Sequence, residues 1–123
     1  MIGIDIAKIS RFEKFFEKKS LLSKFLSEEE ILLVKSTQNV ASLFASKEAI
    51  SKALGVGIGK HCTFKDIRIH KDSLGAPYFT LSKHIIQTYN ITETSLSITH
   101  DGEYAIAVAV IGTEKEPKRE LWH

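Results

Sequence analysis

One stretch decides how the fold is read: Phe44-Ala45-Ser46-Lys47-Glu48-Ala49-Ile50-Ser51-Lys52-Ala53-Leu54, which runs directly into Gly55-Val56-Gly57-Ile58-Gly59-Lys60. Alanine recurs at every fourth position from residue 41 to residue 53. This spacing predicts a helix from about Asn39 to Leu54 with a stripe of small side chains that another backbone can approach closely. Gly55 suits the left-handed turn that follows a helix.

Glu48 and Lys52 lie one turn apart beside the alanine stripe. Small residues bordered by charge are what a pocket floor needs, because larger side chains would fill the space for a ligand. Glu four residues before Lys is also a favoured solvent-exposed pair, which stabilises a helix by about 0.2–0.5 kcal/mol. The helix alone therefore leaves a binding role and a surface ion pair both open.

Length and composition favour one domain spanning residues 1–123, since 123 residues with 43% hydrophobic and 26% charged content are ordinary for a water-soluble protein. No apolar run approaches the roughly 20 residues that cross a bilayer. The first residues lack the basic start and apolar region of a signal peptide, and the single Cys62 has no internal disulfide partner. We therefore expect a cytoplasmic protein with no membrane partner. The tail at 113–123 is charged and predicted to be frayed, with Trp122 as a late anchor.

The rest of the chain predicts short helices and antiparallel strands. Ile2 to Ile6 reads as a short buried strand, and a capping box at Ser27 begins a helix that ends near Lys35 or Ser36. Further elements are expected at 63–70 (strand, irregular near 65–66), 72–77 (turn), 78–81 (strand) and 82–89 (helix).

The clearest local signal is a hairpin near the end of the chain. Strands at 96–100 and 103–111 flank Asp101-Gly102, a connection typical of a type I′ turn. Ala105, Ala107 and Ala109 form one face of the second strand and could lie against the alanine stripe of the helix. Together these elements predict an α+β fold: an antiparallel sheet with helices packed to one side.

Basic residues concentrate between residues 8 and 24. On a helix, Arg11, Lys14 and Lys18 would lie roughly opposite the apolar side chains of the segment. This face is either simply solvated or a docking strip for an acidic partner, where complementary charge speeds encounter and sets orientation. A nucleic-acid binding module is a weaker reading, because the strip has no interleaved exposed aromatics and the formal net charge is only +2.

Asp5 is the only charge in the first strand. Burying such an acid is costly unless it is paired or holds a metal. If the first strand packs on the helix, Asp5 and Glu48 would supply two oxygen ligands suited to Mg²⁺, with Lys52 placed to offset phosphate charge. The glycines at 55, 57 and 59 would let backbone amides approach an anion. His100, beside the tight turn, is the strongest histidine candidate.

Five blocks occur in order between residues 2 and 111: Gly3-Ile4-Asp5-Ile6 with Ile9 and Arg11; Phe25-Leu26-Ser27-Glu28-Glu29-Glu30; Phe44-Ala45-Ser46-Lys47-Glu48-Ala49 with Lys52-Ala53-Leu54-Gly55 and Gly57-Ile58-Gly59; Gly75-Ala76-Pro77-Tyr78; and Ser97-Ile98-Thr99-His100. In this order they resemble the holo-(acyl-carrier-protein) synthases, the small bacterial phosphopantetheinyl transferases. The block at Lys47-Glu48-Ala49 with Lys52 is the most specific part of the likeness.

The resemblance implies transfer of 4′-phosphopantetheine from coenzyme A to a serine of the apo acyl carrier protein, with release of adenosine 3′,5′-bisphosphate. Asp5 and Glu48 would then ligate Mg²⁺ at the pyrophosphate, Lys52 would stabilise its charge, and Glu48 or a water on the metal would help deprotonate the serine. The implied assembly is a homotrimer with active sites between subunits. Residues expected to line the coenzyme A side are Lys47, Gly55, Gly57, Gly59, Lys60 and His100, and Arg11, Lys14 and Lys18 would receive the carrier protein.

The chain departs from the family pattern at one position, and one competing interpretation of its function remains. Many relatives carry arginine just before the Phe44-Ala45 pair, where this chain has Leu43, so a cationic contact is missing or supplied elsewhere. A noncatalytic structural or assembly protein would be favoured if Asp5 were ion-paired and no metal bound.

Overall fold

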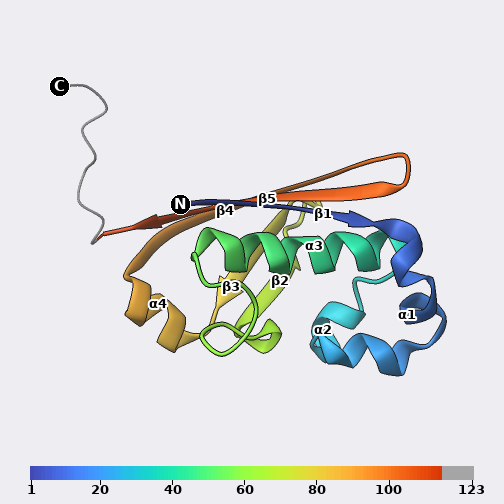
Figure 1. Ribbon diagram of the computed structural model, residues 1–123, viewed down its shortest axis with the longest axis horizontal. Helices are drawn as coiled ribbons and strands as arrows, with labels where there is room; N and C mark the ends of the chain where they lie inside the picture. Colours follow the sequence, from blue (N-terminus) through green and yellow to red (C-terminus); the bar gives the residue numbers. More distant parts are fainter. Residues whose placement is uncertain (115–123) are drawn as a thin grey trace.

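The computed structural model describes residues 1–114, so the predicted tail, with Trp122, lies almost entirely outside the described residues. Its main layer is an antiparallel sheet in the order β1-β5-β4 (Figure 1). These strands are β1 (Ile2–Lys8), β4 (Ile91–Asp101) and β5 (Tyr104–Thr113). A second antiparallel pair is formed by β2 (Ile67–Lys71) and β3 (Pro77–Leu81).

The long helix α3 (Thr37–Ala53) lies along one face of the three-stranded sheet (Figure 1). The shorter elements are η1 (Ile9–Phe12), α1 (Glu13–Glu17), η2 (Lys19–Lys24), α2 (Glu28–Ile31), η3 (Phe64–Asp66) and α4 (Lys83–Tyr89). The helices gather on the α3 side of the sheet, which confirms the predicted α+β class.

The alanine stripe of α3 packs against the alanines of β5, as the sequence predicts. Every residue of both sets is buried: Ala41, Ala45, Ala49, Ala53, Ala105, Ala107 and Ala109. The close approach extends to β1, because a Cβ on Gly3 would collide with the backbone carbonyl oxygen of Ala49 and the amide nitrogen of Ala53. Glycine is therefore needed at position 3, two residues before Asp5.

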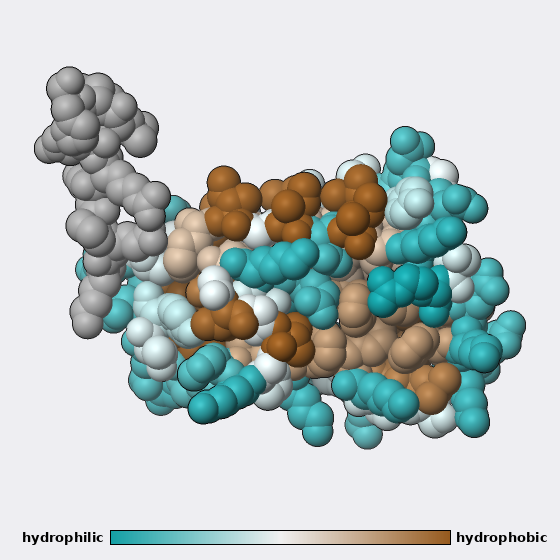
Figure 2. All heavy atoms as spheres, in the orientation of Figure 1, coloured by the Kyte–Doolittle hydropathy of each residue, from teal (hydrophilic) through white to brown (hydrophobic). Residues whose placement is uncertain are grey.

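The first strand is not buried on both faces, and that expectation was wrong. Ile2, Ile4 and Ile6 point away from α3 and are exposed, whereas Gly3, Asp5 and Ala7 face the helix. In register across the sheet, Ile106, Val108 and Val110 continue the apolar face. Figure 2 shows hydrophobic side chains gathered along the edge of the molecule where this sheet lies.

Two local predictions also need correction. The capping box of Ser27 and Glu30 is present, but α2 ends at Ile31, because bonds from Leu33 to Glu30 and from Val34 to Ile31 tighten the chain into a turn. In the hairpin, Asp101 pairs with Tyr104, so the loop is Gly102-Glu103. Among described residues only Asn90 and some glycines have positive φ, and Gly102 at +56° in the first loop position suits a II′ turn rather than I′.

Candidate active site

The helix α3 and strand β1 bring Asp5, Glu48 and Lys52 together. The Lys52 ammonium donates to Asp5 Oδ1 at 2.8 Å and to the carbonyl oxygen of Ile4 at 3.2 Å. The Lys52 side chain is 50% exposed and that of Asp5 15% exposed. A depression of about 280 Å³ opens beside this pair, lined by Ile4, Asp5, Ile6, Lys52 and Ile106.

Glu48 lies one helical turn before Lys52, close enough to Asp5 for the two carboxylates to repel. Partial burial raises the pKa of Glu48 and the Asp5 charge raises it further, while the cations of Lys52 and Arg11 lower it less. Because two partly desolvated carboxylates repel each other, binding of a cation between them is favourable, and a divalent metal ion fits such a pair. Within residues 1–114, no group of three or more His, Cys, Asp or Glu side chains is suited to a metal ion. Other ligands would have to be water or substrate oxygens.

Arg11 lies at the edge of this site rather than only on a distant strip. Its guanidinium stands 5.3 Å from the ring centroid of Phe12 and 5.7 Å from that of Phe44, which is one turn before Glu48. Phe44 belongs to a cluster of phenylalanine rings that joins η1, α1, α3 and η3. The basic segment does not form one continuous helix, because η1 and α1 end before Lys18, but Arg11, Lys14 and Lys18 are all exposed while Phe12 is buried.

Lys47 has a different place from the one predicted. Its side chain is buried and donates to Glu30 Oε1 at 2.7 Å and to the carbonyl oxygens of Phe25 and Phe64 at 2.8 and 3.0 Å. An ammonium has three protons, and these acceptors take all of them. This geometry argues against a cofactor contact by Lys47, because no donor is left for a ligand.

The glycine-rich loop closes α3 instead of presenting free amides. The amides of Val56 and Gly57 donate to the Ser51 carbonyl oxygen, and the amide of Gly55 donates to the Lys52 carbonyl oxygen, which is a Schellman arrangement with Gly55 at φ +82°. The amide of Gly59 donates to the carbonyl oxygen of Cys62. These amides of Gly55, Gly57 and Gly59 are therefore engaged, which argues against the predicted anion cradle, and Lys60 is exposed.

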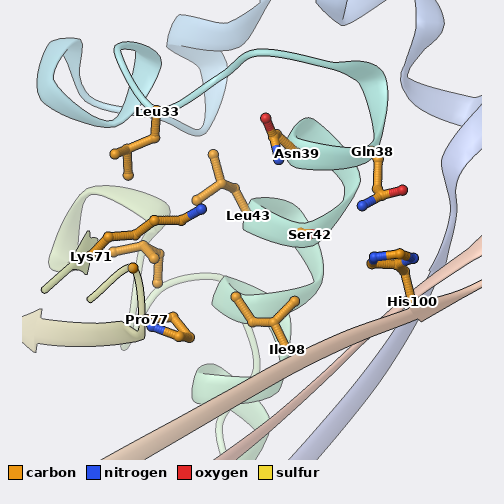
Figure 3. Close-up of a pocket in the computed structure, with 11 residues that line it drawn as sticks. Leu33, Gln38, Asn39, Ser42, Leu43, Lys71, Pro77, Ile98 and His100 are labelled. Atoms are coloured by element: carbon orange, nitrogen blue, oxygen red, sulfur yellow. The ribbon is translucent and has the colours of Figure 1, made fainter. Parts of the chain in front are cut away.

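His100 lies across the helix from Asp5. It lines a cavity of about 200 Å³ between the first half of α3, the β2–β3 pair and β4 (Figure 3). The lining residues are Leu33, Gln38, Asn39, Ser42, Leu43, Ile69, Lys71, Gly75, Pro77, Ile98 and His100. The glycine loop follows the other end of α3, about 25 Å along the helix axis. One chain therefore does not bring His100 and residues 55–60 to a common site.

Lys71, which no sequence pattern singled out, shares the cavity with His100 and Leu43 (Figure 3). Lys71 ends β2, just before the turn that contains Gly75 and Pro77. The alternation of apolar and polar residues along β2 predicts which face of the strand Lys71 is on, but only the packing shows that this face lines the cavity. Cys62 is buried, and burial raises the pKa of its thiol to about 11, which disfavours the reactive thiolate.

Comparisons with known proteins find relatives that match most of this chain. A family model of the 4′-phosphopantetheinyl transferase superfamily matches residues 1–109. The chain is 54% identical over 113 residues to a holo-[acyl-carrier-protein] synthase of Sulfurimonas denitrificans, covering 90% of this chain and 93% of the relative. A Helicobacter pylori synthase solved in complex with coenzyme A has a TM-score of 0.86 and 49% identity, covering 91% of this chain and 100% of that one. A Bacillus anthracis synthase has a TM-score of 0.77 and 36% sequence identity, and the match covers 92% of this chain and 96% of that one.

The chain therefore belongs to the 4′-phosphopantetheinyl transferase superfamily, in its holo-(acyl-carrier-protein) synthase family. It is an enzyme, a transferase, and the noncatalytic readings are set aside. The ion pair of Asp5, which would have favoured a structural protein, instead lies at an accessible edge with Lys52 half exposed. Within the part of the chain that the structure describes, no helix has the length and apolar character needed to cross a membrane.

Proposed function

We propose that the chain transfers the 4′-phosphopantetheine group from coenzyme A to a serine of an acyl carrier protein, with Mg²⁺, in the cytoplasm. The serine oxygen forms a bond to the phosphorus that carries pantetheine, the bond from that phosphorus to the bridging oxygen breaks, and adenosine 3′,5′-bisphosphate leaves. The convergence of Asp5, Glu48 and Lys52 carries the proposal. The relative solved with coenzyme A supports the choice of donor.

Asp5 and Glu48 are the residues that would hold Mg²⁺, since this ion commonly takes one or two carboxylates and completes its shell with water and phosphate oxygens. When bound, the metal neutralises charge on the diphosphate. Lys52 is half exposed, so its ammonium can turn from Asp5 toward a phosphate oxygen and stabilise the developing charge. Glu48, with its raised pKa, is the candidate acceptor of the serine proton.

The cavity beside His100 is the candidate site for the nucleotide end of coenzyme A. Lys71 supports this, because it offers a cation where Leu43 leaves the family's arginine missing. The cavity lies under the β4 edge of the sheet and Asp5 lies on the β1 edge, with α3 between them. We infer that each complete site takes one half from each of two subunits. A homotrimer joins the halves in a ring, and the exposed isoleucine face of β1 offers apolar surface for it.

The strip of Arg11, Lys14 and Lys18 is the proposed dock for the acidic carrier protein. Its end at Arg11 adjoins Glu48, so a docked partner would bring its serine toward the carboxylates. Reversing Lys14 and Lys18 to glutamate should weaken carrier binding and spare coenzyme A binding. Equal loss of both would contradict a separate dock.

The deciding experiment incubates apo carrier protein with coenzyme A, Mg²⁺ and this protein, and measures the carrier by mass spectrometry. The expected result is a shift by one phosphopantetheine, lost without Mg²⁺ and in Asp5→Asn and Glu48→Gln. Glu29→Gln is the matched control, because Glu29 is an exposed carboxylate whose nearest ion pair is 3.8 Å long. Full transfer by Asp5→Asn or Glu48→Gln would defeat the metal assignment, and no shift with any carrier would defeat the function.

A further inference from the structure

A third hollow lies between β3 and β4, where the two strands run side by side without pairing. Among the described strands, β3 pairs with β2 and β4 pairs with β5, so each turns an unpaired edge toward the other. The hollow measures about 230 Å³, and we call it the β3–β4 groove. It is lined by Phe79, Thr80, Leu81, Ile86, Ile91, Thr92, Glu93 and Thr94. None of these residues belongs to the proposed active site.

The β3–β4 groove has an apolar floor and an acidic rim. Phe79 is buried at its base, and Ile86 of α4 forms a wall while remaining 42% exposed. Glu93 stands at the rim, next to the irregularity in β4 between Ile91 and Glu93. Unpaired strand edges beside an apolar floor suit an extended peptide that carries a large apolar side chain.

The chain leaves its last strand beside this groove. Thr113 pairs with Ile91, which lines the groove, and the amide of Glu114 donates to the carbonyl oxygen of Asn90 at 3.0 Å. The nine residues from 115 to 123 follow this point of the chain. Nine residues span at most about 30 Å when extended, which is longer than the five-residue strand β3. The segment is therefore long enough to reach the whole groove.

The composition of that segment matches the groove. Its sequence is Lys115-Glu116-Pro117-Lys118-Arg119-Glu120-Leu121-Trp122-His123, with a single apolar pair near the end and, before it, three basic residues and two acidic ones. Leu121 and Trp122 fit an apolar floor, since a tryptophan buries about 150–250 Å². Lys118 and Arg119 are complementary to Glu93. The family match ends at residue 109, so the segment lies beyond the part that the family model describes.

From the groove, the position of Glu114 and this composition, we propose that the β3–β4 groove binds the C-terminal segment of the same chain, with Leu121 and Trp122 as anchors. The docked segment covers the apolar floor and ties α4 to the end of the sheet. The proposal does not depend on the transferase reaction.

Trp122 is the only tryptophan, so its fluorescence in the full chain reports on its own surroundings. We expect the folded wild type to emit at shorter wavelength than the urea-unfolded chain and to resist acrylamide quenching. Ile86→Glu should shift the emission to longer wavelength and raise quenching toward the unfolded value, with an unchanged far-ultraviolet circular dichroism spectrum. Leu74→Glu is the matched control, because Leu74 is 93% exposed and lies outside the groove, and it should leave both readouts unchanged.

A cross-link separates the same chain from a neighbouring copy. Thr94→Cys with His123→Cys keeps both anchors, and the native Cys62 is buried and resists oxidation. Mild oxidation should give a disulfide within one chain, while Ser73→Cys with His123→Cys, placed on an exposed turn, should not. Unchanged fluorescence in Ile86→Glu would overturn the proposal, as would a disulfide only between chains or equal cross-linking of both pairs.

Discussion

Two lysines of α3, five residues apart, each pair with a carboxylate from another segment, yet one pair is buried and the other is partly exposed. Lys47 meets Glu30 at 2.7 Å with both side chains only 1% exposed. Lys52 meets Asp5 at 2.8 Å with side chains 50% and 15% exposed. The two distances are nearly equal, so length does not distinguish the pairs, whereas burial does.

The buried pair is committed to the fold because every polar atom in it is used. Glu30 accepts from Lys47, from the amide of Ser27 and from the amide of Ile69, so its carboxylate joins α2, α3 and β2. Burial lowers the pKa of Lys47, and the bond and charge of Glu30 offset part of that lowering. The exposed pair is free to exchange Asp5 for a ligand. Solvent access therefore separates the lysine that is committed to the fold from the lysine that we propose acts in the reaction.

The largest expected effect comes from breaking the buried pair. Lys47→Met leaves the Glu30 carboxylate in the core without its cation, which costs about 3–5 kcal/mol of unfolding free energy. Urea denaturation measures this loss. The matched control is Lys52→Met, the same substitution on the same helix, which should change stability by about 1 kcal/mol or less because the pair is half exposed. Equal losses in the two variants would remove the distinction between the pairs.

Lys52→Met should instead fail in catalysis. Removing a cation that stabilises charge in the transition state lowers kcat by about 10²–10³-fold. The mass-shift assay at saturating coenzyme A and carrier protein gives the rate. A folded Lys52→Met protein with wild-type kcat would show that this ammonium has no part in the chemistry.

The exposed pair also depends on how closely β1 approaches α3. Gly3→Ala places a methyl group against the backbone of Ala49 and Ala53, so strand and helix must separate. We expect a loss of about 1–3 kcal/mol in thermal or urea unfolding, together with weaker Mg²⁺-dependent transfer as Asp5 moves. Gly59→Ala serves as the stability control, since nothing lies within 4 Å of its added Cβ. A neutral Gly3→Ala would contradict the close packing.

The smallest effect concerns the pH dependence of stability. Because the folded-state pKa of Glu48 lies above its ordinary value of 4.5, the folded protein binds this proton more tightly than the unfolded chain. The contribution of Glu48 to stability therefore falls as the pH rises from 4.5 through the raised pKa. Glu48→Gln should be slightly more stable than wild type at neutral pH, and the difference should close below pH 4.5. Glu29→Gln, at an exposed carboxylate, should show no such trend, and a trend of opposite sign in Glu48→Gln would refute the assignment.

Local patterns predicted much of this molecule from sequence. The alanine spacing, the capping box at Ser27, and the turn residue Gly55 each depend on contacts within a few positions, so the elements appear where expected. The errors arose where one pattern admits two environments. Alternating isoleucines in β1 suit either a buried or a one-sided strand, and Asp101-Gly102 permits a turn shifted by one residue.

The pairing of Asp5 with Glu48 and Lys52 also followed from sequence, since an isolated acid on a strand and a small-faced helix are each recognisable. Lys47 and Lys52 are the same residue type, however, and both belong to the sequence block that most specifically resembles the family, so the sequence does not distinguish them. Only the packing of Phe25, Glu30 and Phe64 around Lys47 decides which lysine is buried. Lys71 and His100 likewise meet only because β2 and β4 lie beside the start of α3.

The sequence by itself determined the family, the approximate place of most helices and strands, and the acids that we propose for the site. The tertiary structure alone decided which cations face solvent, which glycine amides are already bonded, and that the cavity of His100 lies across α3 from Asp5. The physical reason is the separation along the sequence over which each effect acts, since capping, periodicity and turn geometry depend on neighbours within a few residues. Desolvation and donor saturation depend on neighbours that are distant along the chain.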